Sequence, residues 1–123
     1  MIKILLIEDD PFIREMYIAK IEQEKDYKVI EANNGELGLQ KTEEENPNLI
    51  LLDVVLPKMD GFSVLKQLKQ NQKTKDIPVI ILSNLGHKSD IDKGFSLGAK
   101  EYIIKSHFTP SEILKKIKEI LNN

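Results

Sequence analysis

Four short apolar runs in this chain of 123 residues each end at a side chain that is able to bind a metal ion or a phosphoryl group. Short continuous apolar runs are typical of strands that are buried on both faces of a sheet. Stretches with apolar residues at helical spacing separate them, and this alternation favours an α/β fold with a parallel sheet. The runs and their end groups are Ile2–Ile7 with Glu8 and Asp9, Leu49–Leu52 with Asp53, Val79–Leu82 with Ser83, and Tyr102–Ile104 with Lys105.

The whole pattern predicts five strands, one of them weaker than the rest. Tyr27–Ala32 has weaker apolar content, so we expect it near an edge of the sheet. Pro78 lies near the start of its strand, where a missing backbone donor costs least. The five predicted strands are Ile2–Ile7, Tyr27–Ala32, Leu49–Asp53, Ile77–Ser83 and Lys100–Ile104.

Five helices are predicted from apolar spacing and from turn residues. Asp10 is the expected N-cap of the first helix because Pro11 follows it, and the Asn33–Gly35 turn opens a polar helix of roughly ten residues. The apolar stripes of the other four helices are Ile13, Met16, Tyr17 and Ile21; Phe62, Leu65 and Leu68; Ile91, Phe95 and Gly98; and Ile113, Leu114, Ile117, Ile120 and Leu121.

Composition narrows the class of protein. The length fits one domain over residues 1–123, and the chain has no cysteine, which excludes disulfides, thiolate metal sites and cysteine nucleophiles. No apolar stretch suits a signal peptide or a membrane span, so we expect a cytoplasmic protein. The formal net charge is −2 and no basic stripe with interleaved aromatics occurs, so direct nucleic-acid binding is not expected.

The predicted topology gathers the end groups at one place. Right-handed crossovers make the carboxyl ends of parallel strands meet at one edge of the sheet, and ligands bind there. Three clustered carboxylates raise one another's pKa, and a divalent cation relieves that repulsion. The sequence therefore predicts a cation and phosphoryl site that includes Asp53.

The order and spacing of four segments make the chain resemble the receiver domain of two-component response regulators along essentially its whole length. The resemblance implies the flavodoxin-like strand order 2-1-3-4-5. It also implies a phosphorelay in which a histidine kinase or phosphotransfer protein phosphorylates Asp53. The segments that carry the resemblance are Ile4–Pro11, Leu49–Gly61, Val79–Ser83 and Gly98–Lys105.

The family's site residues carry over onto matching positions. Asp53 is expected to be the nucleophile, and carboxylates are known covalent nucleophiles of this kind. Mg²⁺ prefers oxygen ligands, and here they would be Glu8, Asp9, Asp53 and the backbone carbonyl of Val55. Ser83 and Lys105 would contact the phosphoryl group.

The resemblance also implies a switch. Tyr102 would move from an outward to a buried position as the loop after Ser83 is drawn inward, a local change that biases a bistable face. The affected face would comprise the fourth helix, the fifth strand and the fifth helix, and it would act on an effector protein or output domain. Phosphorylation-dependent homodimerisation stays open, as does the choice between a stand-alone receiver and part of a longer regulator.

Three positions depart from the family. Ser106 replaces the usual cis proline after the lysine, and because a cis bond before another residue costs roughly 3 kcal/mol we expect Lys105–Ser106 to be trans. Asn84 replaces a small residue after Ser83, which is expected to narrow access to Asp53. Val55 has no group to position water, so we expect slow self-hydrolysis of the phosphoryl group.

Two other classes of protein remain as alternatives. A magnesium-dependent phosphatase would also use a strand-end aspartate, but it generally needs a second aspartate two residues on, where this chain has Val55. A degenerate receiver that only binds proteins would lack a site residue, and none is missing here. We therefore expect a phosphoacceptor that is not an enzyme acting on a separate substrate. His87 and His107 are expected to be surface residues, because neither has partner ligands nearby in sequence.

Overall fold

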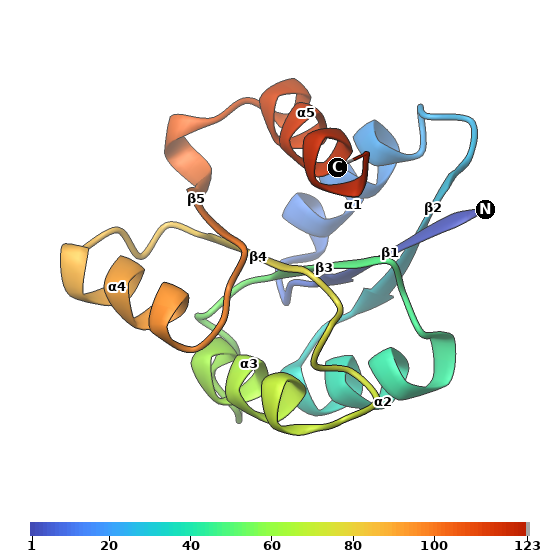
Figure 1. Cartoon of the computed structure of the whole chain (residues 1–123). Coiled ribbons are helices and arrows are strands. Elements are labelled where there is room, and N and C mark those ends of the chain that lie inside the picture. Colours follow the sequence, from blue (N-terminus) through green and yellow to red (C-terminus); the bar gives the residue numbers. More distant parts are fainter. Residues whose placement is uncertain (123) are drawn as a thin grey trace.

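The computed structural model describes residues 1–122 and contains a five-stranded parallel sheet (Figure 1). Its strand order is β2-β1-β3-β4-β5, which confirms the predicted α/β fold. Three strands are slightly shorter than predicted, because Asp53, residues 77–78 and Lys100 lie outside the strands. The strands are β1 (Ile2–Ile7), β2 (Tyr27–Ala32), β3 (Leu49–Leu52), β4 (Val79–Ser83) and β5 (Glu101–Ile104).

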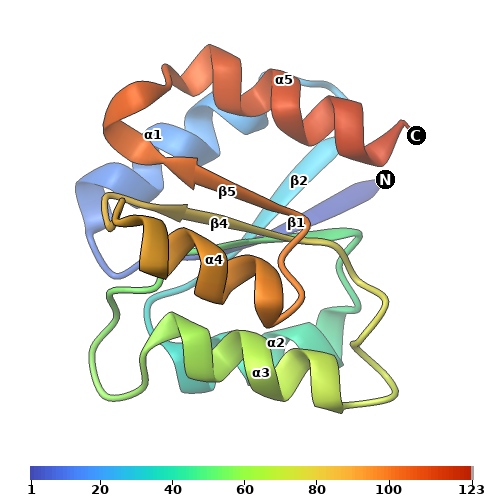
Figure 2. The ribbon, with the colours of Figure 1, turned by 60° about the vertical axis from the view of Figure 1, so that its left-hand side comes forward.

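Helices cover both faces of this sheet (Figures 1 and 2). Two of them, α1 and α5, lie on one face, and α2, α3 and α4 lie on the other, as right-handed crossovers require. A short 3₁₀ helix, η1 (Lys105–His107), follows β5 and had no counterpart among the predicted elements. Within residues 1–122 the α-helices are α1 (Pro11–Ile21), α2 (Gly35–Glu45), α3 (Gly61–Gln70), α4 (Lys88–Ser96) and α5 (Pro110–Leu121).

Local capping explains where the site-bearing helices begin. Asp10 is the N-cap of α1, as predicted, and its Oδ1 accepts hydrogen bonds from the backbone N–H groups of Phe12 and Ile13. Asp60 caps α3 in the same way through Ser63. These caps satisfy backbone donors at the helix starts, so α1 and α3 begin directly after the loops that carry the predicted site.

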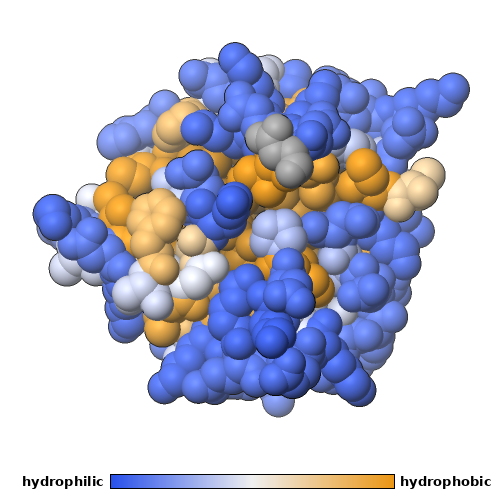
Figure 3. All heavy atoms as spheres, viewed as in Figure 1, coloured by the Kyte–Doolittle hydropathy of each residue, from blue (hydrophilic) through white to orange (hydrophobic). Residues whose placement is uncertain are grey.

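Each face of the sheet has its own hydrophobic core. Alternate residues of the strands point to opposite faces, so Leu5 and Ile7 of β1 pack under α2 and α3, whereas Ile4 and Leu6 pack under α1 and α5. In the view of Figure 3, hydrophilic residues cover most of the surface, and hydrophobic residues form a band between the two helical layers. Within residues 1–122, no helix is both long and apolar enough to cross a membrane.

Two residues of the predicted apolar stripes are exposed, although both lie in the helices that the stripes predicted. Met16 is 45% exposed and Phe95 is 46% exposed. In α1 the buried side chains are Tyr17 and Ile21. In α4 the buried position is Gly94, where an added Cβ would lie 2.7 Å from Ile81 Cδ1. The helix approaches the sheet too closely at that point to place a large side chain inward.

The edge positions of the sheet agree with the sequence pattern. β2 lies at one end of the sheet, and most of its side chains are exposed or half-buried, which confirms the expected edge strand. β5 lies at the other end and pairs only with β4. The central strands β1, β3 and β4 are therefore flanked on both sides, and their carboxyl ends form the middle of the edge at which ligands bind in such sheets.

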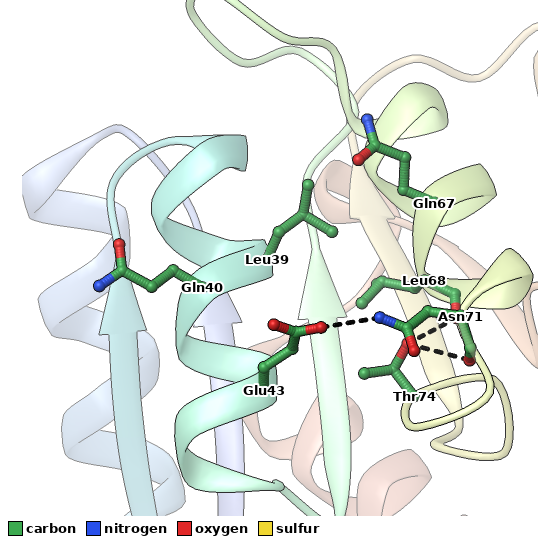
Figure 4. A pocket seen from close by; sticks show the side chains of 7 residues that line it. All are labelled: Leu39, Gln40, Glu43, Gln67, Leu68, Asn71 and Thr74. Atoms are coloured by element: carbon green, nitrogen blue, oxygen red, sulfur yellow. Dashed lines mark hydrogen bonds between the residues drawn. The ribbon is translucent and has the colours of Figure 1, made fainter.

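A polar pocket of about 240 Å³ lies between α2 and α3 (Figure 4). Its lining comes from the C-terminal halves of both helices and from the turn after α3. The Asn71 side-chain amide donates a 2.8 Å hydrogen bond to Glu43 Oε1 and thereby links the two helices. Buried Thr74 donates to the Leu68 carbonyl oxygen at 2.6 Å. None of the predicted site residues lines this pocket.

Candidate functional site

The carboxyl ends of β1, β3, β4 and β5 bring the predicted metal and phosphoryl site residues, but not Tyr102, into one pocket of about 430 Å³. Parallel pairing places Ile7 beside Leu52, and Ser83 beside Ile104, so the residues that follow these strands share one edge. The lining includes Glu8, Asp9, Asp53, Val55, Ser83 and Lys105, together with Asp10, Ile13, Asn84 and Leu85.

Asp53 is buried at the floor of the site, with 7% of the residue exposed. Its Oδ1 accepts a 3.1 Å hydrogen bond from the Val55 backbone N–H, and its Oδ2 accepts one of 2.8 Å from Lys105 Nζ. Gly61 packs against it from behind, because a Cβ at that position would lie 2.3 Å from the Asp53 carbonyl oxygen. The carboxylate is therefore held with both oxygens directed at named donors.

Lys105 connects the two buried acids of the site. Its Nζ lies 2.5 Å from Glu8 Oε1 as well as 2.8 Å from Asp53 Oδ2, and its side chain is only 10% exposed. Burial alone would lower the pKa of Lys105, but the hydrogen bonds to Asp53 and Glu8 outweigh burial and raise it. For Glu8 burial is the larger effect and raises the pKa, although the ammonium of Lys105 opposes it. Lys105 therefore stays cationic at neutral pH.

Three carboxylates form the acidic cluster that the sequence predicted. One oxygen each of Glu8, Asp9 and Asp53 lies within 4.8 Å of the others, and within residues 1–122 no other set of three potential ligands does so. Glu8 is 2% exposed, and its Oε2 accepts a hydrogen bond from the Asp10 N–H at 3.1 Å. Such an all-oxygen donor set with an open side toward the pocket suits a hard divalent cation that keeps some of its water. The cluster could therefore hold a metal ion.

Val55, whose carbonyl oxygen was predicted to be a metal ligand, lines the same pocket as this cluster. The residue is 60% exposed and lines the pocket, and its N–H is the group that contacts Asp53. That its carbonyl oxygen is a metal ligand stays a prediction. The exposed isopropyl group offers no hydrogen bond to a water molecule in the pocket, as expected from the sequence.

Ser83 and Asn84, at the end of β4, line the pocket. Ser83 is fully buried, and its Oγ accepts a 3.3 Å hydrogen bond from the Leu85 N–H. The Oδ1 of Asn84 accepts a 3.0 Å hydrogen bond from the Ser106 backbone N–H. That bond joins the loop after β4 to η1. That Asn84 narrows access to Asp53 stays a prediction. No cis peptide bond occurs within residues 1–122, which confirms the expected trans Lys105–Ser106 bond.

Tyr102 is already buried in this structure. The residue is 9% exposed, and its hydroxyl donates a hydrogen bond to the Leu85 carbonyl oxygen. Burial raises the pKa of the phenol to about 12, with smaller contributions from the charges of Asp90 and Asp53. The predicted movement between two positions is not tested by one conformation and stays a prediction.

Arg14 lies outside the pocket but contacts the backbone of two site residues, and the sequence did not predict it. Its Nη1 donates hydrogen bonds to the carbonyl oxygens of Glu8 at 2.9 Å and Asp9 at 3.3 Å. Its Nε donates to Glu31 Oε1 at 2.9 Å. Nothing in the sequence pattern places it there, because the contact with Glu31 joins residues 17 apart in sequence. The two histidines, by contrast, are exposed as predicted, with His87 at the N-cap of α4 and His107 in η1.

A sequence model of the response regulator receiver domain matches residues 4–118. The chain belongs to this family. Among curated receiver proteins it is 38% identical over 119 residues to the DNA-binding dual master transcriptional regulator RpaA of a Synechocystis strain. It is 37% identical over 119 residues to the phosphate regulon transcriptional regulatory protein PhoB of Escherichia coli. These alignments cover 97% of this chain but 48% and 51% of the relatives, so the chain spans about half their length.

Solved receiver structures agree in fold. A CheY-like receiver domain protein from Methanospirillum hungatei superposes with a TM-score of 0.91 at 30% identity, over 99% of this chain and 94% of that one. The Mn²⁺-bound form of the response regulator Rcp1 gives a TM-score of 0.83 at 30% identity, over 98% and 91%. The receiver is therefore a component of two-component signalling by family and has the flavodoxin-like receiver fold.

Proposed function

We propose that this receiver accepts a phosphoryl group on Asp53 from the phosphohistidine of a histidine kinase or a phosphotransfer protein. The observation that carries the proposal is the pair of contacts from Lys105 Nζ to Asp53 Oδ2 and Glu8 Oε1. These contacts fix a buried nucleophile and a cation in one pocket, next to carboxylates that could bind a divalent ion. Positioning and electrostatic stabilisation are the main requirements of phosphoryl transfer.

The transfer is a displacement at phosphorus. A carboxylate oxygen of Asp53 attacks, the new O–P bond forms, and the P–N bond of the phosphohistidine breaks. The imidazole nitrogen keeps the electron pair of the broken bond and is the leaving group. The ammonium of Lys105, which is hydrogen-bonded to Asp53, would stabilise the negative charge of the incoming phosphoryl oxygens.

Glu8, Asp9 and Asp53, with the carbonyl oxygen of Val55, are the residues that would hold Mg²⁺. The bound ion would neutralise negative charge on the phosphoryl oxygens. The donor set is made of oxygens only, as Mg²⁺ prefers, and the similar Rcp1 structure has been solved in an Mn²⁺-bound form. The phosphoryl group ends on the chain itself, so the receiver is proposed to be a phosphoacceptor and not an enzyme with a separate substrate.

The response would pass through the β4–α4 loop to the α4–β5–α5 face. Ser83 heads that loop, and Leu85 within it contacts Tyr102 of β5, so a pull on Ser83 changes the surroundings of Tyr102. The partner on this face would be an effector protein or an output domain, and the RpaA and PhoB relatives are named as transcriptional regulators. A phosphorylation-dependent homodimer through the same face is compatible with this proposal.

Incubation with acetyl phosphate and Mg²⁺, followed by intact mass measurement, tests the phosphoacceptor. We expect a gain of one phosphoryl group in the wild type and none in Asp53→Asn. Asp60→Asn is the matched control, because Asn is also a good N-cap and Asp60 lies outside the pocket. No gain in the wild type would refute the proposal and favour a receiver that acts only as a protein-binding module.

A further inference from the structure

Arg14 holds the segment that carries two of the three clustered carboxylates. It lies in the first turns of α1, and its guanidinium reaches back to the carbonyl oxygens of both Glu8 and Asp9. Its Nε is fixed in turn by Glu31 near the end of β2. The Arg14 side chain is 16% exposed and that of Glu31 is 56% exposed, so the guanidinium lies largely beneath the surface.

The choice of arginine at this position is informative. The other 17 basic residues of the chain are lysines. A guanidinium presents several N–H groups in a rigid planar fork, whereas an ammonium is a point charge on a flexible stem. Arg14 uses that fork to donate to three oxygens on two different elements, the β1–α1 loop and β2.

Asp9 is the carboxylate that depends most on this contact. Glu8 is buried, and its side chain is bonded to Lys105 and to the Asp10 N–H. The Asp9 side chain is exposed, and within residues 1–122 no hydrogen bond holds its carboxylate. No side-chain partner holds it, so its location depends on the Asp9 backbone from which it extends, and the Asp9 carbonyl oxygen is one of the groups that Arg14 binds.

We propose that Arg14 is a positioning residue that fixes the backbone of Glu8 and Asp9, so that the Asp9 carboxylate is directed at a divalent cation in the site. The proposal rests on the metal site of the proposed function. The charge and the positioning role of Arg14 have opposite effects on cation affinity. A positive charge near a cation site weakens cation binding, so removing the charge alone would strengthen binding. Loss of positioning would weaken it.

Mn²⁺ binding measured by electron paramagnetic resonance separates these two effects. We expect Arg14→Gln and Arg14→Lys to bind Mn²⁺ about tenfold more weakly than the wild type, the size typical for groups that orient metal ligands. The result for Arg14→Lys shows that charge is not the cause. Lys28→Gln is the control: it removes the charge of an exposed lysine in β2 and is expected to change the Mn²⁺ affinity little. Equal or tighter binding by Arg14→Gln would overturn the proposal.

The same experiment distinguishes the role of Arg14 from the existence of the site. If the wild type itself does not bind Mn²⁺, the metal site of the proposed function fails. If the wild type and Asp60→Asn bind Mn²⁺ and Asp9→Asn does not, the site stands, and the Arg14 variants then decide the proposal. Circular dichroism of each variant shows whether it is folded.

A nuclear magnetic resonance measurement covers the case in which the Arg14 variants do not fold. As the only arginine, Arg14 gives a single Nε–H cross-peak. We expect this proton to exchange slowly with water in the wild type, to exchange several-fold faster in Glu31→Ala, and to shift when Mg²⁺ is added. The Glu31→Ala variant is also expected to bind Mn²⁺ more weakly. An Nε–H signal that neither Mg²⁺ nor Glu31→Ala alters would overturn the proposal.

Discussion

The side-chain oxygen of Asn84 accepts a 3.0 Å hydrogen bond from the backbone N–H of Ser106. The bond joins the loop that follows β4 to η1, and so connects the neighbours of Ser83 and Lys105. Proline has no N–H and could not donate it. The two departures from the usual receiver sequence, at positions 84 and 106, are therefore partners in one contact.

Removal of this contact should be visible at the Ser106 amide. We expect Asn84→Ala to make Ser106 N–H exchange about fivefold faster, because a typical neutral hydrogen bond contributes about 1 kcal/mol. Amide exchange measured by nuclear magnetic resonance checks this. Asn84→Asp keeps an acceptor oxygen and is expected to retain most of the protection. Equal exchange in the wild type and Asn84→Ala would show that the bond is not formed in solution.

The lifetime of the phosphoryl group is predicted to depend on Val55. This exposed side chain lines the pocket and cannot orient water for attack on phosphorus. We expect Val55→Asn to hydrolyse the aspartyl phosphate about fivefold faster, the rate change that corresponds to one hydrogen bond of about 1 kcal/mol in the transition state. Decay of the phosphorylated mass measures it, with Val55→Thr as a second polar variant. Faster decay in the wild type would contradict the prediction.

The Tyr102 phenol is predicted to make stability depend on pH in the alkaline range. Its folded-state pKa is raised to about 12, and its ordinary value is 10.0, so the neutral phenol is favoured in the folded state. That contribution is fully present below pH 10.0 and is lost as pH rises towards about 12. We expect the difference in free energy of unfolding between the wild type and Tyr102→Phe to shrink across this window.

Urea unfolding followed by circular dichroism at several pH values gives this difference. An ultraviolet titration adds a direct check, because Tyr102→Phe should lack one phenolate transition near pH 12. A pH-independent difference between the two proteins would mean that Tyr102 titrates alike in the folded and unfolded states.

Gly61 is predicted to be the least replaceable glycine beside the site. A Cβ there would lie 2.3 Å from the Asp53 carbonyl oxygen and 2.5 Å from Val54 Cα, and backbone atoms cannot move aside as a side chain can. We expect Gly61→Ala to lower the free energy of unfolding by about 3 kcal/mol, at the upper end of the usual cost of overpacking. Urea unfolding measures the loss.

Gly86→Ala is the matched control for this substitution. Its Cβ would meet the end of the Ile104 side chain at 3.0 Å, a contact that a small side-chain adjustment relieves. We expect it to cost less than half as much as Gly61→Ala. Similar losses at the two positions would show that the contact with the Asp53 backbone is not the cause.

The sequence alone was enough to predict the sheet and most of the site, because both depend on local signals. Apolar runs mark the strands, and parallel pairing then places the residues after them at one edge. Glu8, Asp53, Ser83 and Lys105 each follow such a run directly, and Asp9 comes one residue later. The helix start at Asp10 is local in the same sense, because the cap and the donors it satisfies lie within three residues.

Only the tertiary structure decided how closely the elements approach and which distant groups meet. Phe95 has the right spacing to be buried, but Gly94 takes the inward position because α4 lies too near Ile81 and Tyr102. Arg14 meets Glu31, and Asn84 meets Ser106, through contacts of 17 and 22 residues in sequence separation. Such contacts depend on distances between packed elements, which hydrophobic periodicity does not encode. The site residues at the strand ends could therefore be predicted from the sequence, but the contacts that hold the neighbouring loops in place could not.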